Sequence, residues 1–265
     1  MDNFKALISD FDGTLTDSTY KLSPQVKEAI LNIVKQGICF SIATGRPYHG
    51  IVKKVCQELN LISPQIVSGG ALIVDPKTDQ VLWGEYFPIN SAKKLIDSFI
   101  ENNYDFAVES EGCVFVLNSS IWSGYGPGIV FQDFKKLKFD RIAKIVLEDV
   151  SSIGDSLDLE EEYNKLYPDL HFIRSGINKI VFDITSEKAT KHLAVLELSK
   201  ILKINPKEMI GIGDGYNDYP LLSICGYKVA MGSAPKELKE IADLIVPDVS
   251  QDGLVTLIRS LYNGQ

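Results

Sequence analysis

Residues 4–14 read FKALISDFDGT, an apolar run that ends in two carboxylates, Asp10 and Asp12, followed by Gly13 and Thr14. An apolar run of this length is typical of a buried strand, and strand side chains at positions i and i+2 point to the same face. Two carboxylates on one face repel each other unless one is protonated or a cation lies between them. The stretch therefore predicts either a polar turn after a strand or a catalytic or metal site at its end.

Strand and helix signals alternate in the first third of the chain. A helical pattern over 24–36 is followed by an apolar run at 38–43, by a second helix expected to begin at Pro47, and by a short apolar stretch at 66–67. Strands that alternate with helices build a parallel sheet with helices on both faces. This order predicts a βαβαβ unit whose three strands share one sheet.

The pattern changes in the middle of the chain. Short strands joined by turns replace the strand–helix alternation, and a Gly-rich stretch at 123–128 interrupts them. Trp122 and Tyr125 belong to this part, where they either line a substrate pocket or pack the module. Paired strands with occasional helices predict a small α+β module.

The alternation of strands and helices returns late in the chain, with a helix whose apolar face is expected to carry Leu193, Leu196 and Ile201. We therefore predict an α/β fold with a Rossmann-like parallel-sheet core, made of residues 1–84 and 186–265, that is split by an inserted α+β domain, residues 85–185.

Composition limits the possible partners of this chain of 265 residues. The 27 basic and 35 acidic residues give a formal net charge of −8, which argues against a general nucleic-acid or anionic-membrane binder. No signal peptide is visible, and no apolar run approaches the ~20 residues of a membrane span. The four cysteines form no C-x-x-C pair, so neither a disulfide framework nor a zinc site is indicated. We predict a soluble cytoplasmic protein whose oligomeric state the sequence leaves open.

Polar residues follow several of the expected strands. Thr44-Gly45-Arg46 follows one, and Gly213-Asp214 with Asn217 shortly after it follows another. Parallel α/β sheets bind ligands at the carboxyl ends of their strands. Carboxylate oxygens suit Mg²⁺, and a hydroxyl with backbone amides before a helix suits an anion. The combination predicts a magnesium-assisted phosphate site.

Other phosphate chemistries fit the sequence less well. Six residues separate Cys39 from Arg46, where a cysteine phosphatase has five, and Cys39 lies inside an apolar run. No G-x-x-x-x-G-K-[ST] loop occurs in the sequence, which argues against a P-loop NTPase. The glycines near 211–215 approximate the fingerprint of a dinucleotide-binding fold, but Tyr216 stands at the position of the third glycine. This difference argues against dinucleotide binding.

Four motifs together resemble a known family. DFDGTLTD, SIATGR, a lysine near the start of a late helix and GIGDGYNDYPLL occur in the order of the four motifs of haloacid dehalogenase-like (HAD) phosphatases. The pattern is similar to the Cof-type branch, whose α/β cap is inserted between the second and third motifs. The resemblance implies a Mg²⁺-dependent phosphatase acting on a small phosphorylated metabolite, such as a sugar phosphate or a cofactor phosphate.

The resemblance also implies roles for the acidic residues. Asp10 would be the nucleophile that forms an aspartyl-phosphate, and Asp12 the general acid and base. The carboxylates of Asp10 and Asp214, with the backbone carbonyl of Asp12, would hold Mg²⁺, supported by Asp218. Arg46 would either contact substrate or anchor its loop.

The substrate-binding residues implied by the resemblance are Thr44, Gly45, Lys191 and Asn217. The third motif is its weakest match, because histidine follows Lys191 where the family usually has glycine. Lys188 is therefore the alternative phosphate-binding lysine, and Lys191 is preferred because its distance to the next strand fits better.

Two further functions fit the same motifs. A phosphotransferase or phosphomutase would pass the phosphoryl group from Asp10 to a second hydroxyl instead of to water. A non-catalytic regulator would bind a phosphorylated metabolite on the same fold, but it would not need the intact set of Asp10, Asp12, Lys191 and Asp214.

Overall fold

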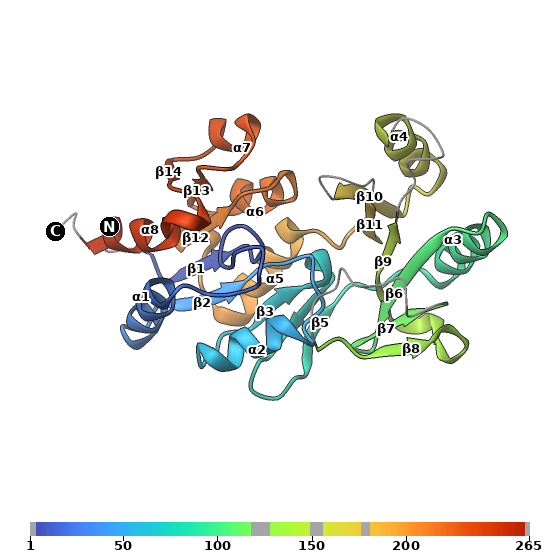
Figure 1. The fold of residues 1–265 in the computed structure, drawn as a ribbon, viewed down its shortest axis with the longest axis horizontal. Coiled ribbons are helices and arrows are strands. Elements are labelled where there is room, and N and C mark those ends of the chain that lie inside the picture. Colours follow the sequence, from blue (N-terminus) through green and yellow to red (C-terminus); the bar gives the residue numbers. More distant parts are fainter. Residues whose placement is uncertain (1–3, 118–127, 149–155, 176–180, 263–265) are drawn as a thin grey trace.

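The computed structural model describes residues 4–117, 128–148, 156–175 and 181–262. Its central sheet is parallel, with the strand order β14-β13-β12-β1-β2 (Figure 1). The strands are β1 (Ala6–Ser9), β2 (Cys39–Ile42), β12 (Met209–Gly213), β13 (Tyr227–Met231) and β14 (Leu244–Val246). β1 lies between β12 and β2, and its last residue, Ser9, pairs with Ile212 on one side and Ile42 on the other. The predicted parallel α/β core is confirmed.

Helices cover both faces of this sheet because its strands are apolar on both sides. In β1, Leu7 packs in one core cluster and its neighbours Ala6 and Ile8 pack in the opposite one. The first cluster lies under α1 (Pro24–Lys35), α2 (Ile51–Glu58) and α8 (Gly253–Tyr262). The second lies under α5 (Lys191–Leu202), α6 (Tyr219–Ile224) and α7 (Lys236–Glu240).

Two local predictions are wrong. β3 (Gln65–Val67) is not a full strand of the central sheet: it begins an antiparallel sheet with β4 (Leu72–Val74) and β5 (Val81–Gly84). It meets the end of β2 at the Ala43–Ile66 bridge and through the Ile42 amide, which donates to Gln65 Oε1 at 2.7 Å. The short turn after β3 brings β4 back alongside it, so β4 takes its hydrogen bonds. The helix expected at Pro47 begins at Ile51, because Gly50 has a φ of 74°, which no α-helix contains.

The buried face of α5 also differs from the prediction. Leu193 and Ile201 are 36% and 39% exposed, whereas Ala194, Val195 and Leu198 are buried. Lys191 shares the face of these buried residues at helical spacing. Since its side chain points into the molecule, the helix is rotated away from the face with the larger apolar residues.

The inserted residues form a six-stranded sheet with the order β10-β11-β9-β6-β7-β8. Its strands are β6 (Asp105–Ser110), β7 (Cys113–Val116), β8 (Phe131–Asp133), β9 (Ile142–Glu148), β10 (Leu170–Ser175) and β11 (Val181–Ser186). α3 (Ile89–Glu101) and α4 (Ser156–Leu166) lie on the side away from the core (Figure 1). This arrangement confirms the inserted α+β unit, which we call the cap. Trp122 and Tyr125 lie outside the described residues.

Short 3-10 helices complete the described elements: η1 (Ser68–Gly70), η2 (Phe134–Lys136), η3 (Phe139–Arg141), η4 (Pro206–Glu208), η5 (Tyr216–Asp218) and η6 (Val249–Gln251). Within the described parts of the chain, none of the helices has the length and apolar character needed to cross a bilayer.

Candidate active site

Parallel pairing of the central strands brings the first and last acidic motifs together. The Asp10 amide donates to the Ile212 carbonyl at 2.9 Å and so continues the ladder between β1 and β12. Asp214 directly follows the end of β12. Asp10 and Asp214 therefore emerge at the same edge of the sheet, as predicted for ligands at the carboxyl ends of strands.

Lys191 reaches this edge from the first turn of α5. Thr190 caps the helix by accepting from the Leu193 amide at 3.2 Å. The Lys191 Nζ donates to Asp10 Oδ1 and to Asp218 Oδ1, each at 2.6 Å, and its side chain is only 3% exposed. Lys188 is exposed. Of the two lysines considered, Lys191 is thus the one that lies against Asp10.

Asp218 organises the loop that carries Asp214. Its Oδ2 accepts from the amides of Asp214 at 3.0 Å and of Gly215 at 2.9 Å, and the residue is fully buried. A Cβ on Gly213 would lie 2.4 Å from the Asp218 Cγ, so only glycine allows the two to approach so closely. The GDGxND motif thus folds into a compact loop with Asp218 at its centre.

Three carboxylates form a possible cation site. Asp10, Asp214 and Asp218 each offer an oxygen, and these atoms lie within 4.8 Å of one another. The Thr14 hydroxyl of the DGT motif donates to Asp214 Oδ1 at 2.7 Å, a positioning contact that the motif alone does not reveal. An all-oxygen set of this kind suits a hard cation such as Mg²⁺. The side chain of Asp12 is not part of the group.

Burial and charge shift the protonation of this cluster. Burial, followed by repulsion from Asp218, raises the pKa of Asp10 well above its usual value, although Lys191 opposes the shift. Burial raises the pKa of Asp214 to about 6, against the hydrogen bond from Thr14. Burial alone would lower the pKa of Lys191, but attraction to Asp10 and Asp218 outweighs the effect of burial and raises this pKa. The cluster therefore holds excess negative charge that a cation would relieve.

Asp12 points to a different partner. Its Oδ2 accepts from Arg46 Nε at 2.6 Å, and its side chain is 42% exposed. The Arg46 guanidinium lies 4.5 Å from the centre of the Tyr20 ring, and the Arg46 amide donates to the Thr44 hydroxyl at 3.1 Å. Arg46 therefore holds both its own loop and the Asp12 carboxylate, a link that the spacing of the motifs did not reveal.

The remaining predicted residues lie around this network. Thr44 is buried two residues after the end of β2, and its amide donates to the Ile66 carbonyl at 3.0 Å. The Gly45 carbonyl accepts from Lys144 Nζ of the cap at 2.8 Å. Asn217 is exposed on η5, one residue before Asp218. The structure thus joins Asp10, Asp214 and Lys191 through Asp218, and it joins Thr44 to Asp12 through Arg46.

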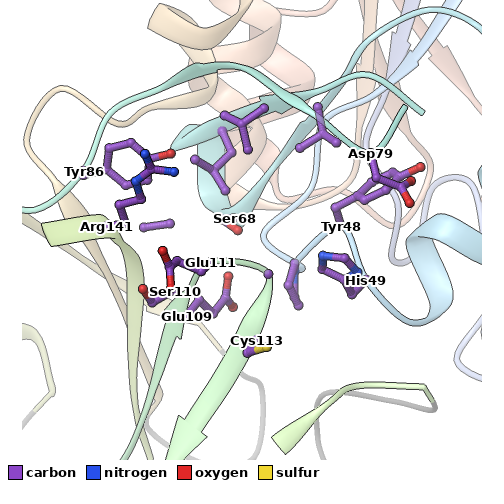
Figure 2. Close-up of a pocket in the computed structure, with 16 residues that line it drawn as sticks. Tyr48, His49, Ser68, Asp79, Tyr86, Glu109, Ser110, Glu111, Cys113 and Arg141 are labelled. Atoms are coloured by element: carbon purple, nitrogen blue, oxygen red, sulfur yellow. The ribbon is translucent and has the colours of Figure 1, made fainter. Parts of the chain in front are cut away.

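A pocket of about 240 Å³ lies between the core and the cap, beside the Thr44–Arg46 loop. Pro47, directly after Arg46, lines it, and so does Ser68, whose amide donates to the Arg46 carbonyl at 2.8 Å. Figure 2 shows side chains from both units around it, including Tyr48, His49, Asp79, Tyr86, Glu109, Ser110, Glu111 and Arg141. A molecule bound there would contact the core and the cap together.

This chain is similar to known proteins over nearly its whole length. A family model for haloacid dehalogenase-like hydrolases matches residues 7–258. A relative from Haemophilus influenzae is 26% identical over 271 residues, which cover 98% of each chain. A 5-amino-6-(5-phospho-D-ribitylamino)uracil phosphatase from Bacillus subtilis is 23% identical, covering 98% of this chain and 99% of its own.

Solved structures share the fold over nearly the whole chain. A haloacid dehalogenase-like hydrolase from Bacteroides thetaiotaomicron superposes with a TM-score of 0.84 at 23% identity, covering 97% of this chain and 99% of its own. A sugar phosphatase of HAD subclass IIB superposes with a TM-score of 0.82 at 22% identity, covering 97% and 98%.

Proposed function

This chain belongs to the haloacid dehalogenase-like hydrolase family, as a phosphatase of the Cof type, and from that premise we propose that it hydrolyses small phosphomonoesters with Mg²⁺ through an aspartyl-phosphate on Asp10. The observation that carries the proposal is the buried network in which Lys191 joins Asp10 to Asp218. An anionic carboxylate can approach an anionic phosphate only where cations neutralise the charge, and this network supplies one cation and an oxygen-lined place for another.

The proposed reaction has two displacements on phosphorus. An oxygen of Asp10 attacks the phosphorus, the bond to the leaving oxygen breaks, and Asp12 protonates that oxygen. Asp12 then takes a proton from water as the water oxygen attacks the same phosphorus. The bond from phosphorus to Asp10 breaks, which restores the carboxylate and releases inorganic phosphate. Arg46 occupies Asp12 Oδ2, so we assign proton transfer to Oδ1.

The other residues bind and position. Lys191 and the Thr44 hydroxyl would hold the phosphoryl oxygens, with Gly45 and Asn217 at the edge of the same site. Asp10, Asp214 and the Asp12 carbonyl would hold Mg²⁺, with Asp218 orienting their loop. When bound, the ion neutralises the charge on the nucleophile and the phosphoryl group.

The substrate class is a small phosphate ester with a polar leaving group. Relatives include a sugar phosphatase and a phosphatase of a ribitylamino-uracil phosphate. Polar, aromatic and aliphatic side chains line the pocket between the core and the cap, where we propose that selectivity for the leaving group arises. We propose cap boundaries at 84/85, directly after Gly84 at the end of β5, and at 185/186, between the last two residues of β11, which ends at Ser186.

Removing divalent metal should abolish hydrolysis of a generic aryl phosphate, and Mg²⁺ should restore it. Without the ion, Asp10 and the phosphoryl group repel each other across the site. The measurement is the turnover rate after dialysis against EDTA and again after adding Mg²⁺. Full activity in metal-free buffer would contradict the proposed mechanism, and no activity with Mg²⁺ on any phosphate ester would contradict the proposed function.

The affinity for Mg²⁺ should fall as the pH drops below about 6, the value to which burial raises the pKa of Asp214. The raised pKa means that the folded metal-free protein binds protons more tightly than the unfolded chain does. The contribution of Asp214 to stability should therefore decrease as the pH rises from about 4 to 6, and Mg²⁺ should reverse that loss above pH 6. Thermal unfolding with and without Mg²⁺ across this range tests the prediction. An Mg²⁺-induced rise in Tm that is equal at pH 5 and pH 7.5 would exclude it.

A further inference from the structure

One cap side chain contacts the backbone of the core loop that carries Thr44 and Arg46. Lys144, on β9, has a side chain only 6% exposed, and its Nζ lies 2.8 Å from the Gly45 carbonyl oxygen and 2.8 Å from Asp183 Oδ1. Asp183 lies on the neighbouring strand β11 and is 27% exposed. A lysine so buried needs both partners, because a buried ammonium without them is costly.

Both members of this ion pair pack against Gly45. A Cβ added to Gly45 would lie 3.6 Å from Lys144 Nζ and 3.6 Å from Asp183 Oδ2. The contact is therefore made by a carboxylate and an ammonium that pack together on one glycine, rather than by one long side chain that happens to reach across.

The contacted loop leads to two proposed active-site residues. Thr44 precedes Gly45, and its hydroxyl accepts from the Arg46 amide at 3.1 Å. Arg46 follows Gly45 and binds Asp12 Oδ2 at 2.6 Å. A continuous chain of contacts thus runs from Asp183 through Lys144 and the loop to Asp12.

We propose that Lys144 is a positioning residue for the reaction: its contact with Gly45 sets the Thr44–Arg46 loop, and with it Asp12, when the cap lies against the core. Turnover then depends on cap docking through this contact, since a cap that moves away leaves the loop without its donor. In the undocked state Lys144 keeps Asp183 as its partner and gains water, so the contact can break without leaving a buried charge. The inference rests on the proposed phosphatase function.

The test is the kinetics of Lys144→Met with Mg²⁺ and an aryl phosphate. A small misplacement of reacting groups costs up to ~10²-fold in rate, so kcat should fall by about that factor while KM changes little. Hydrogen exchange in a peptide that covers 43–47 should become faster. Lys165→Met is the matched control: Lys165 pairs with Glu161 on the exposed face of α4, and its loss should change neither kcat nor exchange.

The double variant Lys144→Met/Asp183→Asn distinguishes two causes of a slow single variant: the missing donor to the Gly45 carbonyl, and the unpaired charge left on Asp183. If the single variant is slow only because Asp183 is left unpaired, the double variant recovers wild-type kcat and the proposal is overturned. If the missing donor to Gly45 is the cause, the double variant stays as slow as the single one.

Should Lys144→Met fail to fold, Lys144→Gln, whose uncharged amide is one bond shorter, replaces it with the same expected loss. A wild-type protein without phosphatase activity would refute the proposed function. An active wild type with a Lys144 variant of unchanged kcat would refute only this inference.

Discussion

Asp10→Asn should reduce phosphatase turnover by on the order of 10⁴-fold or more, because it removes the proposed nucleophile and with it the covalent route. The fold should survive. Lys191 keeps Asp218 as its partner at 2.6 Å. The substitution also removes a carboxylate that is destabilised in the folded protein, since burial and repulsion from Asp218 raise its pKa. We therefore expect a Tm equal to or above that of the wild type. The measurement is kcat with Mg²⁺ beside a thermal melt.

The matched control for this variant is Asp17→Asn, because Asp17 is a partly exposed carboxylate in the same segment. Its Oδ1 accepts hydrogen bonds from the Thr19 amide, the Thr19 hydroxyl and the Lys21 amide. Asp17→Asn should leave turnover unchanged. Acid quenching during turnover of a labelled phosphate ester should trap label on the wild-type protein and none on Asp10→Asn. Residual turnover within about tenfold of wild type, or label on the variant, would show that another group attacks phosphorus.

Lys191→Met should affect both activity and stability. Loss of one preorganised donor to a phosphoryl group costs ~10²–10³-fold in kcat. The variant also leaves Asp10 and Asp218 buried without their common cation, and breaking a buried pair costs about 3–5 kcal/mol. Protonation of a carboxylate lowers that cost at acidic pH, so the loss of stability should be smaller at pH 5 than at pH 8.

Lys188→Met is the control for Lys191→Met, because Lys188 lies three residues earlier and is exposed. Urea unfolding at both pH values and kcat with Mg²⁺ measure the two effects. If Lys188→Met were the inactive variant instead, the phosphate-binding lysine would be misassigned.

The parts of the fold that the sequence predicted are those in which local pattern and global packing agree. The apolar runs before Asp10 and Asp214 form strands that are buried on both faces, so their hydrophobicity alone identifies them. The motifs that end these strands predicted which residues meet at the sheet edge. Spacing to the next strand favours Lys191 over Lys188, and the structure places Lys191 at Asp10.

The parts that the sequence did not predict depend on contacts between distant residues. β3 has the composition of a core strand, yet its partner is decided by the turn that returns β4 to it. α5 exposes Leu193 and Ile201, whereas its inward face carries Lys191 together with Ala194, Val195 and Leu198, and a pattern of apolar residues alone does not identify a face that includes a buried lysine. The bonds from Arg46 to Asp12 and from Lys144 to Gly45 join separate segments, and neither leaves a periodic signal.

The central position of β1 has a consequence for synthesis of the chain on the ribosome. β1 is made before both of its neighbours, and one of them, β12, emerges about 200 residues later, as the separation of Thr14 from its partner Asp214 shows. At ~5–20 residues per second this is a wait on the order of 10–40 s. During it the cap sheet can form from contiguous chain, while β1 keeps one unpaired apolar edge. The nascent core is thus exposed to aggregation until its last third arrives, and catalytic competence begins only then.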